Sequence, residues 1–226
     1  MNLALLVGLV LLPAASMSFA FQLVNASKPL VLWAVALPYA LLAGLAIARM
    51  WKDGELGEKL RPRSGDLAKG AFIAMLLYLG AMAGTYLLSP IGSPREQWLM
   101  RLYLQIGDPE LFQRNFVPMS LLVASIAALE EIAWRGLGFG IAEQKWGTRR
   151  AFPIVTALYG AAHLPSLIVL AVPGVGWNPL LFLAAAGCGI VWSFLVAKTG
   201  RLPVAVFSHA MFTWLVTVQF PLWRLG

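Results

Sequence analysis

Residues 116–144 read FVPMSLLVASIAALEEIAWRGLGFGIAEQ, an apolar run with Glu130, Glu131 and Arg135 at its centre. A run of this length can cross the hydrocarbon core of a membrane, for which a helix needs about 20 apolar residues. A charged side chain at the centre of such a helix costs about 2.5–3.5 kcal/mol on insertion scales. The stretch therefore predicts a transmembrane helix whose charged residues face a polar cavity inside a bundle and not lipid.

The composition of the whole chain agrees with a membrane protein. Of 226 residues, 60% are hydrophobic and 12% are charged, about half the charged share of soluble domains. Disordered, collagen-like and disulfide-stapled secreted proteins are excluded. The single cysteine, Cys188, forms no internal disulfide and is interpreted as a packing residue. The net charge of +7 comes from basic residues between apolar runs, so nucleic-acid binding is not expected.

We predict an all-α fold, a polytopic transmembrane helix bundle of about seven spans that forms a single integral membrane domain over residues 1–226. The apolar runs cover about residues 3–24, 30–50, 68–88, 116–144, 151–172, 179–197 and 202–223. The first run is long for a signal peptide and follows no Lys or Arg, so it is interpreted as a retained span. Between the third and fourth runs, residues 89–115 mix charges with large apolar residues and predict an interfacial amphipathic segment.

The basic residues predict the orientation. The connections after the second, fourth and sixth runs carry eleven of them: Arg49, Lys52, Lys59, Arg61, Arg63, Lys69, Lys145, Arg149, Arg150, Lys198 and Arg201. The other connections and the C-terminus carry five: Lys28, Arg95, Arg101, Arg114 and Arg224. The positive-inside rule places the richer connections and the N-terminus in the cytoplasm, and we expect a bacterial cytoplasmic membrane.

Acidic or basic side chains and histidines lie inside apolar runs, where apolar side chains would otherwise be expected. Glu131 and Arg135 are four residues apart and can pair on one helix face, whereas Glu130 points about 100° away and needs another partner. The two histidines, His163 and His209, both fall inside apolar runs. A buried polar clamp that only fixes packing is the structural alternative, but buried ion clusters add little net stability. We expect the groups to converge on one cavity, which leans toward the cytoplasm because His209 lies nearest that end of its helix.

A carboxylate beside an imidazole in a dry cavity can activate water, and a second imidazole or a hydroxyl can donate to an oxyanion. This set suits hydrolysis of a peptide bond inside the membrane. Two histidines and a carboxylate could instead bind zinc, although the His-Glu-x-x-His spacing is absent. The residues alone leave both possibilities open.

Three elements in order carry a resemblance to a known family: Glu130-Glu131-x-x-x-Arg135, Tyr159-x-x-x-His163 and His209-x-x-x-Thr213. They resemble the motifs of the CAAX-protease and bacteriocin-processing (CPBP, or Abi) family, which includes the Ras-converting prenyl endopeptidases. The resemblance covers about residues 116–220. It implies a catalytic core over residues 116–223 and accessory spans over residues 1–115.

The resemblance implies an intramembrane glutamate-type endopeptidase of the CAAX prenyl protease type. Glu130 would be the general base, assisted by His163, and His209 with Thr213 would stabilise the oxyanion. Glu131, Arg135 and Tyr159 would support them. The family usually has Phe where Tyr159 stands and Asn or Asp where Thr213 stands, so oxyanion binding can differ here.

The resemblance also implies partners and cofactors. We expect contact with membrane lipids and a protein or peptide substrate that is lipid-modified or has a C-terminal anchor. No cofactor or metal is expected to be required, with zinc as the alternative. Two other functions stay open: a non-catalytic membrane immunity or assembly factor, which Thr213 favours, and a proton-coupled transporter, for which inverted repeats are not evident.

Overall fold

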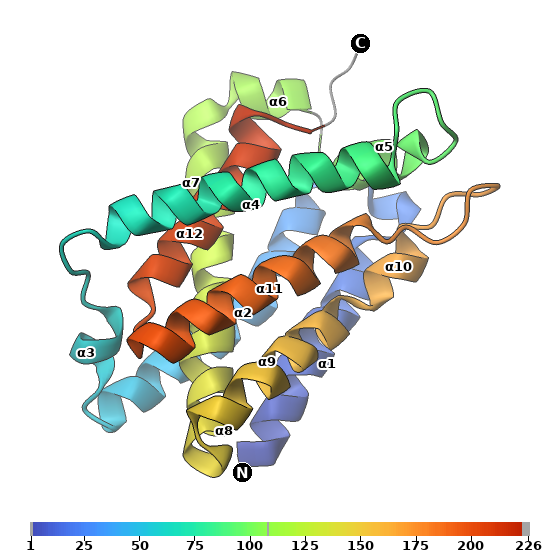
Figure 1. Ribbon diagram of the computed structural model, residues 1–226. Helices are drawn as coiled ribbons and strands as arrows, with labels where there is room; N and C mark the ends of the chain where they lie inside the picture. The colour runs from blue at the N-terminus through green and yellow to red at the C-terminus, as the bar shows by residue number, and fades with distance from the viewer. Residues whose placement is uncertain (1, 108, 223–226) are drawn as a thin grey trace.

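The computed structural model describes residues 2–107 and 109–222, and this part of the chain is a bundle of helices (Figure 1). It contains no β-strand over the described residues, and an isolated bridge joins Val172 to Gly176. The predicted all-α, polytopic helix-bundle fold is therefore confirmed.

Over the described residues, six helical segments are long and apolar enough to cross a membrane: Leu3–Ala20, Pro29–Lys52, Asp66–Leu88, Phe116–Trp146, Thr148–Val169 and Leu180–Thr199. The last predicted run forms α12 (Pro203–Trp214), which continues into the π-helix η3 (Leu215–Gln219). Together they cover 17 residues, at the lower end of the length that a membrane-spanning helix needs. Residue 223, the end of the predicted run, lies outside the described residues.

The long helices are α1 (Asn2–Ala20), α2 (Pro29–Lys52), α4 (Asp66–Leu88), α7 (Phe116–Glu131), α9 (Thr148–His163) and α11 (Leu180–Thr199). The short elements are η1 (Leu23–Asn25), α3 (Leu56–Leu60), α5 (Glu96–Ile106), α6 (Pro109–Arg114), the π-helix η2 (Ile132–Gly138), α8 (Phe139–Trp146) and α10 (Pro165–Val169). The fourth predicted span is thus one continuous helical rod, α7–η2–α8.

The α7–η2–α8 rod is the centre of the bundle. It runs behind α4 and α11, which cross the front of the molecule in Figure 1. α12 packs against both α7 and α4, α9 packs against α11, and α2 packs against η2 and α1. The aromatic side chains of Trp134, Tyr159 and Trp192 lie fully buried in the core between these helices. Both predicted histidine helices, α9 and α12, therefore lie next to the charged segment.

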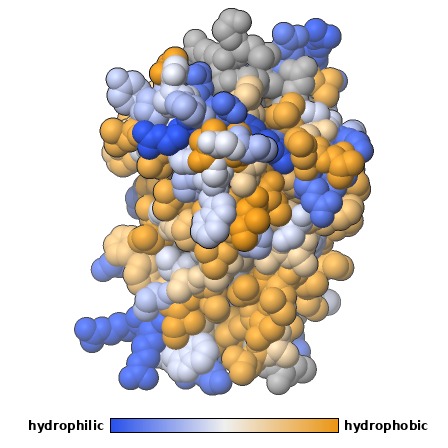
Figure 2. Space-filling view, turned by 90° about the vertical axis from the view of Figure 1, so that its right-hand side faces the viewer, coloured by the Kyte–Doolittle hydropathy of each residue, from blue (hydrophilic) through white to orange (hydrophobic). Residues whose placement is uncertain are grey.

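The outside of the bundle is apolar. Large hydrophobic side chains such as Leu11, Leu41, Phe72 and Val117 are exposed on the sides of the long helices. Figure 2 shows hydrophobic residues over much of the middle of one face, while the hydrophilic ones gather mainly toward the upper and lower parts. An apolar band between polar ends matches the surface that a bilayer requires. The chain is an integral membrane protein.

The three connections rich in basic residues meet at one end of the bundle, which we call the basic end (residues 49–69, 145–150 and 198–202). Arg201 donates to both carboxylate oxygens of Asp66, at 2.9 and 3.1 Å, and to the carbonyl of Arg61 at 3.1 Å. The backbone N–H of Leu202 donates to the carbonyl of Lys59 at 2.9 Å. The hydrogen bonds that Arg201 donates to Asp66 raise the pKa of Arg201, so this guanidinium stays charged.

The remaining connections meet at the opposite end, which we call the α5 end (residues 21–28, 89–115 and 170–179). Arg101 of α5 donates to the carbonyl of Phe21 at 3.0 Å, and Gln105 donates to the carbonyl of Ala20 at 2.7 Å. These side chains satisfy carbonyls at the C-terminus of α1, which its own helix leaves unpaired. Burial lowers the pKa of Arg101. α5 is the predicted amphipathic segment, and it is held by polar contacts on one side.

Candidate active site

Glu130 lies near the end of α7 and faces polar groups inside the bundle. The hydroxyl of Tyr159 donates a hydrogen bond to Glu130 Oε1 at 2.7 Å. His163 Nε2 lies 3.8 Å from the same oxygen. Both partners belong to α9. Glu130 is only 8% exposed, so its carboxylate does not face lipid. The carboxylate has the polar surroundings that its position in a membrane helix requires.

The ring of His163 has a defined orientation. Its Nδ1 lies 2.9 Å from the carbonyl oxygen of Tyr159. A carbonyl can only accept, so Nδ1 carries the proton, and Nε2 of the neutral ring presents a lone pair. That lone pair faces Glu130 Oε1. Two acceptors at this separation can share the two protons of one water molecule.

Glu131 is the adjacent acid and has different partners. Its Oε1 accepts a hydrogen bond from Arg135 Nη1 at 3.0 Å and lies 2.9 Å from His209 Nδ1. Arg135 also donates to the carbonyl of Gly189 at 3.0 Å, and its guanidinium lies 4.4 Å from the centroid of the Tyr159 ring. The predicted Glu131–Arg135 pair is therefore present, and Glu131 in addition holds His209, which the sequence analysis did not anticipate.

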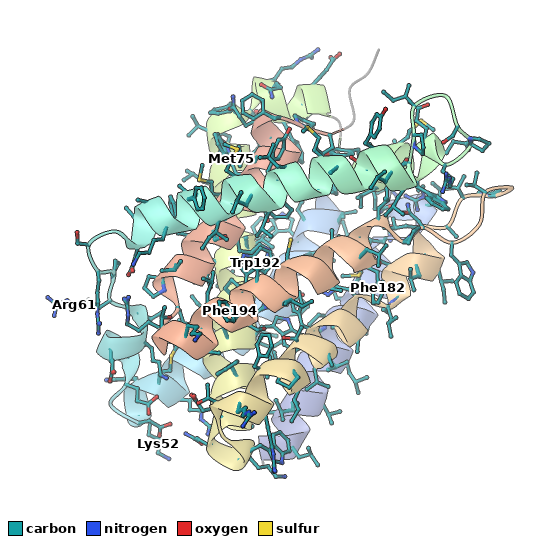
Figure 3. The ribbon with its side chains drawn as sticks, in the orientation of Figure 1. Lys52, Arg61, Met75, Phe182, Trp192 and Phe194 are labelled. Atoms are coloured by element: carbon teal, nitrogen blue, oxygen red, sulfur yellow. The ribbon has the colours of Figure 1, made fainter. Side chains whose placement is uncertain are left out.

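His209 lies on α12 with its ring stacked on Trp192, at a centroid distance of 3.7 Å and an interplanar angle of 19°. Trp192 belongs to α11, and Figure 3 labels it near the middle of the bundle, between α4 and α11 in this view. Since Nδ1 of His209 contacts the carboxylate of Glu131, Nε2 is the nitrogen available to the cavity that His209 lines. The stack and the carboxylate together fix both the tilt and the direction of the imidazole.

Thr213 lies one helical turn after His209 and also lines the cavity. Within the described part of the chain, its hydroxyl has no hydrogen-bonding partner, and its carbonyl accepts a hydrogen bond from the Thr217 hydroxyl at 2.6 Å. The hydroxyl is therefore free to meet a ligand.

Two π-helices adjoin the site, and the sequence analysis did not anticipate them. η2 begins at Ile132, directly after Glu131, and η3 begins at Leu215, two residues after Thr213. π-Helical turns are rare and occur often at functional sites. Gly136 and Gly138 in η2 were the available signal, but glycine alone does not distinguish a π-helix from a helix packing contact.

Tyr39 of α2 is a further site residue that was missed. Its hydroxyl is buried without a hydrogen-bonding partner among the described residues, as is the indole N–H of Trp134. Tyr39 lines the same cavity as Glu130 and interacts electrostatically with it. A tyrosine inside the second apolar run was the signal for it.

The site residues open onto a cavity of about 590 Å³. Its polar lining includes Glu130, His163 and His209, and most of the other wall residues are apolar. The size is that of a site for a ligand of several hundred daltons. Apolar side chains from α1, α2, α4, α5, α7, α11 and α12 complete the wall: Met17, Val35, Leu76, Leu99, Val123, Leu181 and Phe212.

The cavity extends toward the α5 end. Its wall contains Leu88, Leu99, Tyr103 and Leu222, whereas none of its described lining residues belongs to the basic end. The expected lean toward the start of α12, where His209 lies, is therefore wrong. The reason is that the large buried side chains of Trp134 and Leu137 in η2 fill the space between the charged cluster and the basic end.

The zinc alternative requires two imidazoles and a carboxylate on one ion. Here His163 lies beside Glu130, while His209 lies beside Glu131. Over the described residues, no group of three or more His, Cys, Asp or Glu side chains is arranged to hold a metal ion. The two histidines thus belong to two separate carboxylate–imidazole pairs.

Comparison with known proteins supplies the class. Residues 112–215 match the family model described as type II CAAX prenyl endopeptidase Rce1-like. This segment is similar to the CAAX protease family, and the match supports an intramembrane endopeptidase at the level of the family. No curated protein and no solved structure matches the chain.

Gly189 allows α11 to approach α9 at the site. A Cβ atom at Gly189 would lie 2.6 Å from Tyr159 Cδ1, whereas at Gly187 no described atom lies within 4 Å. We expect Gly189→Ala to lower the free energy of unfolding by about 1–3 kcal/mol, because the packed ring must move. Thermal unfolding in detergent measures this, with Gly187→Ala as the matched control. Equal stability of the two variants would contradict the close packing.

Proposed function

We propose that the protein is a glutamate-type intramembrane endopeptidase that uses Glu130 and His163 to activate water. The observation that carries the proposal is the facing pair of acceptors, Glu130 Oε1 and His163 Nε2, 3.8 Å apart on the wall of one cavity. The family match supports the same class of reaction.

In the proposed mechanism, a water molecule donates one proton to Glu130 and one hydrogen bond to His163. As the water oxygen attacks the carbonyl carbon of the peptide bond, Glu130 takes the proton and the carbonyl oxygen becomes an oxyanion. Glu130 then returns the proton to the leaving amine as the C–N bond breaks. The hydroxyl of Tyr159 keeps Glu130 Oε1 oriented throughout.

His209 and Thr213 are proposed to stabilise the oxyanion. A doubly protonated His209 would direct Nε2–H into the cavity while its Nδ1–H stays on Glu131. The unpartnered Thr213 hydroxyl supplies a second donor, one that is shorter than an asparagine amide. Glu131 and Arg135 act as positioning residues, because they hold the ring of His209 and the backbone of α11.

We propose residues 116–223 as the catalytic core and residues 1–115 as accessory spans. The N-terminus is proposed to lie in the cytoplasm, in a bacterial cytoplasmic membrane. The proposed substrate is a protein or peptide with a lipid modification or a C-terminal anchor, and the apolar walls of the cavity support an apolar ligand. The alternative is a non-catalytic immunity or assembly factor, which the threonine at position 213 favours.

The general-base role is tested by Glu130→Gln. We expect the rate of peptide cleavage to fall by a factor of about 10²–10⁴, the usual contribution of a general base, while the protein still accumulates in the membrane. His163→Ala is expected to act similarly. The assay compares C-terminal peptides of membrane and secreted proteins in cells with each variant.

The control for this experiment is Glu58→Gln, the same substitution on an exposed residue of α3. It should cleave at the wild-type rate. Wild-type cleavage by Glu130→Gln would overturn the catalytic assignment, and a cellular function that survives Glu130→Gln would favour the non-catalytic alternative.

Tyr159→Phe tests whether the hydroxyl orients the base. Loss of a hydrogen bond to a charged group costs about 1.5–3 kcal/mol, so we expect kcat to fall about ten-fold or more with KM unchanged. Tyr78→Phe is the matched control, since its hydroxyl donates to the carbonyl of Phe220 at 3.1 Å, away from Glu130. An unchanged kcat in Tyr159→Phe would remove the hydroxyl from the mechanism.

We propose that no metal is required, because one Glu–His pair suffices to move the protons. Activity is expected to persist after dialysis of the purified protein against a chelator. Metal analysis of the same sample is the second measurement. Stoichiometric zinc, with activity lost on chelation and restored by zinc alone, would establish the zinc-dependent variant instead.

A further inference from the structure

We propose that the catalytic cavity is reached from the non-cytoplasmic side of the membrane. The substrate is then a peptide segment of an exported, membrane-anchored protein. The identity of the reaction rests on the proposed function, but the direction of access rests on charge and geometry alone.

The first observation is that the bundle has one strongly basic end. Hydrogen bonds join its three connections to one another: Leu202 N–H to the Lys59 carbonyl at 2.9 Å, and Arg49 to Gln144 Oε1 at 2.5 Å. In Figure 3, Lys52 and Arg61 point outward at this end. Eleven of the 17 basic residues of the chain lie in these connections. The connections after the second, fourth and sixth apolar runs thus lie together at one end, on one side of the membrane, as the positive-inside rule predicts.

The second observation is that the opposite end holds few free basic residues. The hydrogen bond from Asn178 to the Trp98 carbonyl, 2.8 Å long, joins the connection between α10 and α11 to α5. Arg101 is buried and bound to the carbonyl of Phe21. Arg114 is paired with Glu110 at 3.1 Å. The two ends therefore differ in charge in the same direction as their counts of basic residues.

The third observation is the direction of the cavity. From Glu130 it extends to Tyr103 of α5 and to Leu222, both at the α5 end. On the other side of the charged cluster, Trp134, Leu137 and Leu202 are at most 1% exposed and pack in the main core. This layer closes the site toward the basic end.

The cavity also has a lateral side that suits an anchored substrate. Gly80 of α4 and Gly187 of α11 are exposed and line it, and neither has a side chain to close the space between the two helices. A polypeptide whose anchor stays in the outer half of the bilayer can therefore present its scissile bond to Glu130. The positive-inside rule assigns the basic end to the cytoplasm, which places this entry on the other side.

The lone cysteine makes the test direct. In a Cys188→Ala background, single cysteines are introduced as Trp51→Cys at the basic end, Ile91→Cys at the α5 end and Thr85→Cys on the cavity wall. Trp51 and Ile91 are 77% and 87% exposed, so neither substitution disturbs the core. Intact cells and lysed cells are treated with a membrane-impermeant maleimide, and the labelled fraction of the full-length protein is compared.

We expect Ile91→Cys and Thr85→Cys to react in intact cells, and Trp51→Cys to react only after lysis. Labelling of Trp51→Cys in intact cells, with Ile91→Cys protected, would overturn the proposal. So would protection of Thr85→Cys in intact cells when it reacts after lysis. Labelling needs no catalysis, so adding Glu130→Gln should leave the pattern unchanged, and failure of the proposed protease activity stays distinguishable from failure of the orientation.

Discussion

A carboxylate inside a membrane must be paired or hydrogen-bonded, and this chain has two such acids side by side. On a helix, neighbouring residues point about 100° apart, so Glu130 and Glu131 need partners on different helices. Glu130 finds Tyr159 and His163 on α9, while Glu131 finds His209 on α12 as well as Arg135 on its own rod. The pair of acids thus fixes the rod between α9 and α12. The same requirement that positions the helices brings both imidazoles to one cavity.

Much of this arrangement could be predicted, because it follows from the free-energy cost of placing charged side chains inside a membrane. The charges in the middle of residues 116–144 required polar partners, and the i,i+4 spacing of Glu131 and Arg135 predicted their pairing. The link between Glu131 and His209 could not be predicted, because helix spacing says nothing of contacts between helices. The same holds for Tyr39, which is 91 positions from Glu130 along the sequence. The direction of the cavity was mispredicted, since it depends on the packing of Trp134, Leu137 and Leu202 and not on where His209 lies along its helix.

The two halves of the chain supply different parts of the cavity wall. The acids and imidazoles come from the segment that matches the protease family, residues 112–215. Much of the apolar wall comes from α1, α2, α4 and α5, outside that segment. A ligand in the cavity would therefore contact residues both inside and outside the matched segment. α5 has two contacts: its polar side binds the end of α1, and its apolar side lines the cavity.

An experimental structure of the protein in a lipid nanodisc, at a resolution that shows ordered water, tests the central claim most directly. The account predicts the Glu130 carboxylate within reach of His163 Nε2 through one water molecule, with His209 held by Glu131 on the same cavity. A Glu130 carboxylate that faces lipid, or that lies beyond water-mediated contact with both imidazoles, would contradict it.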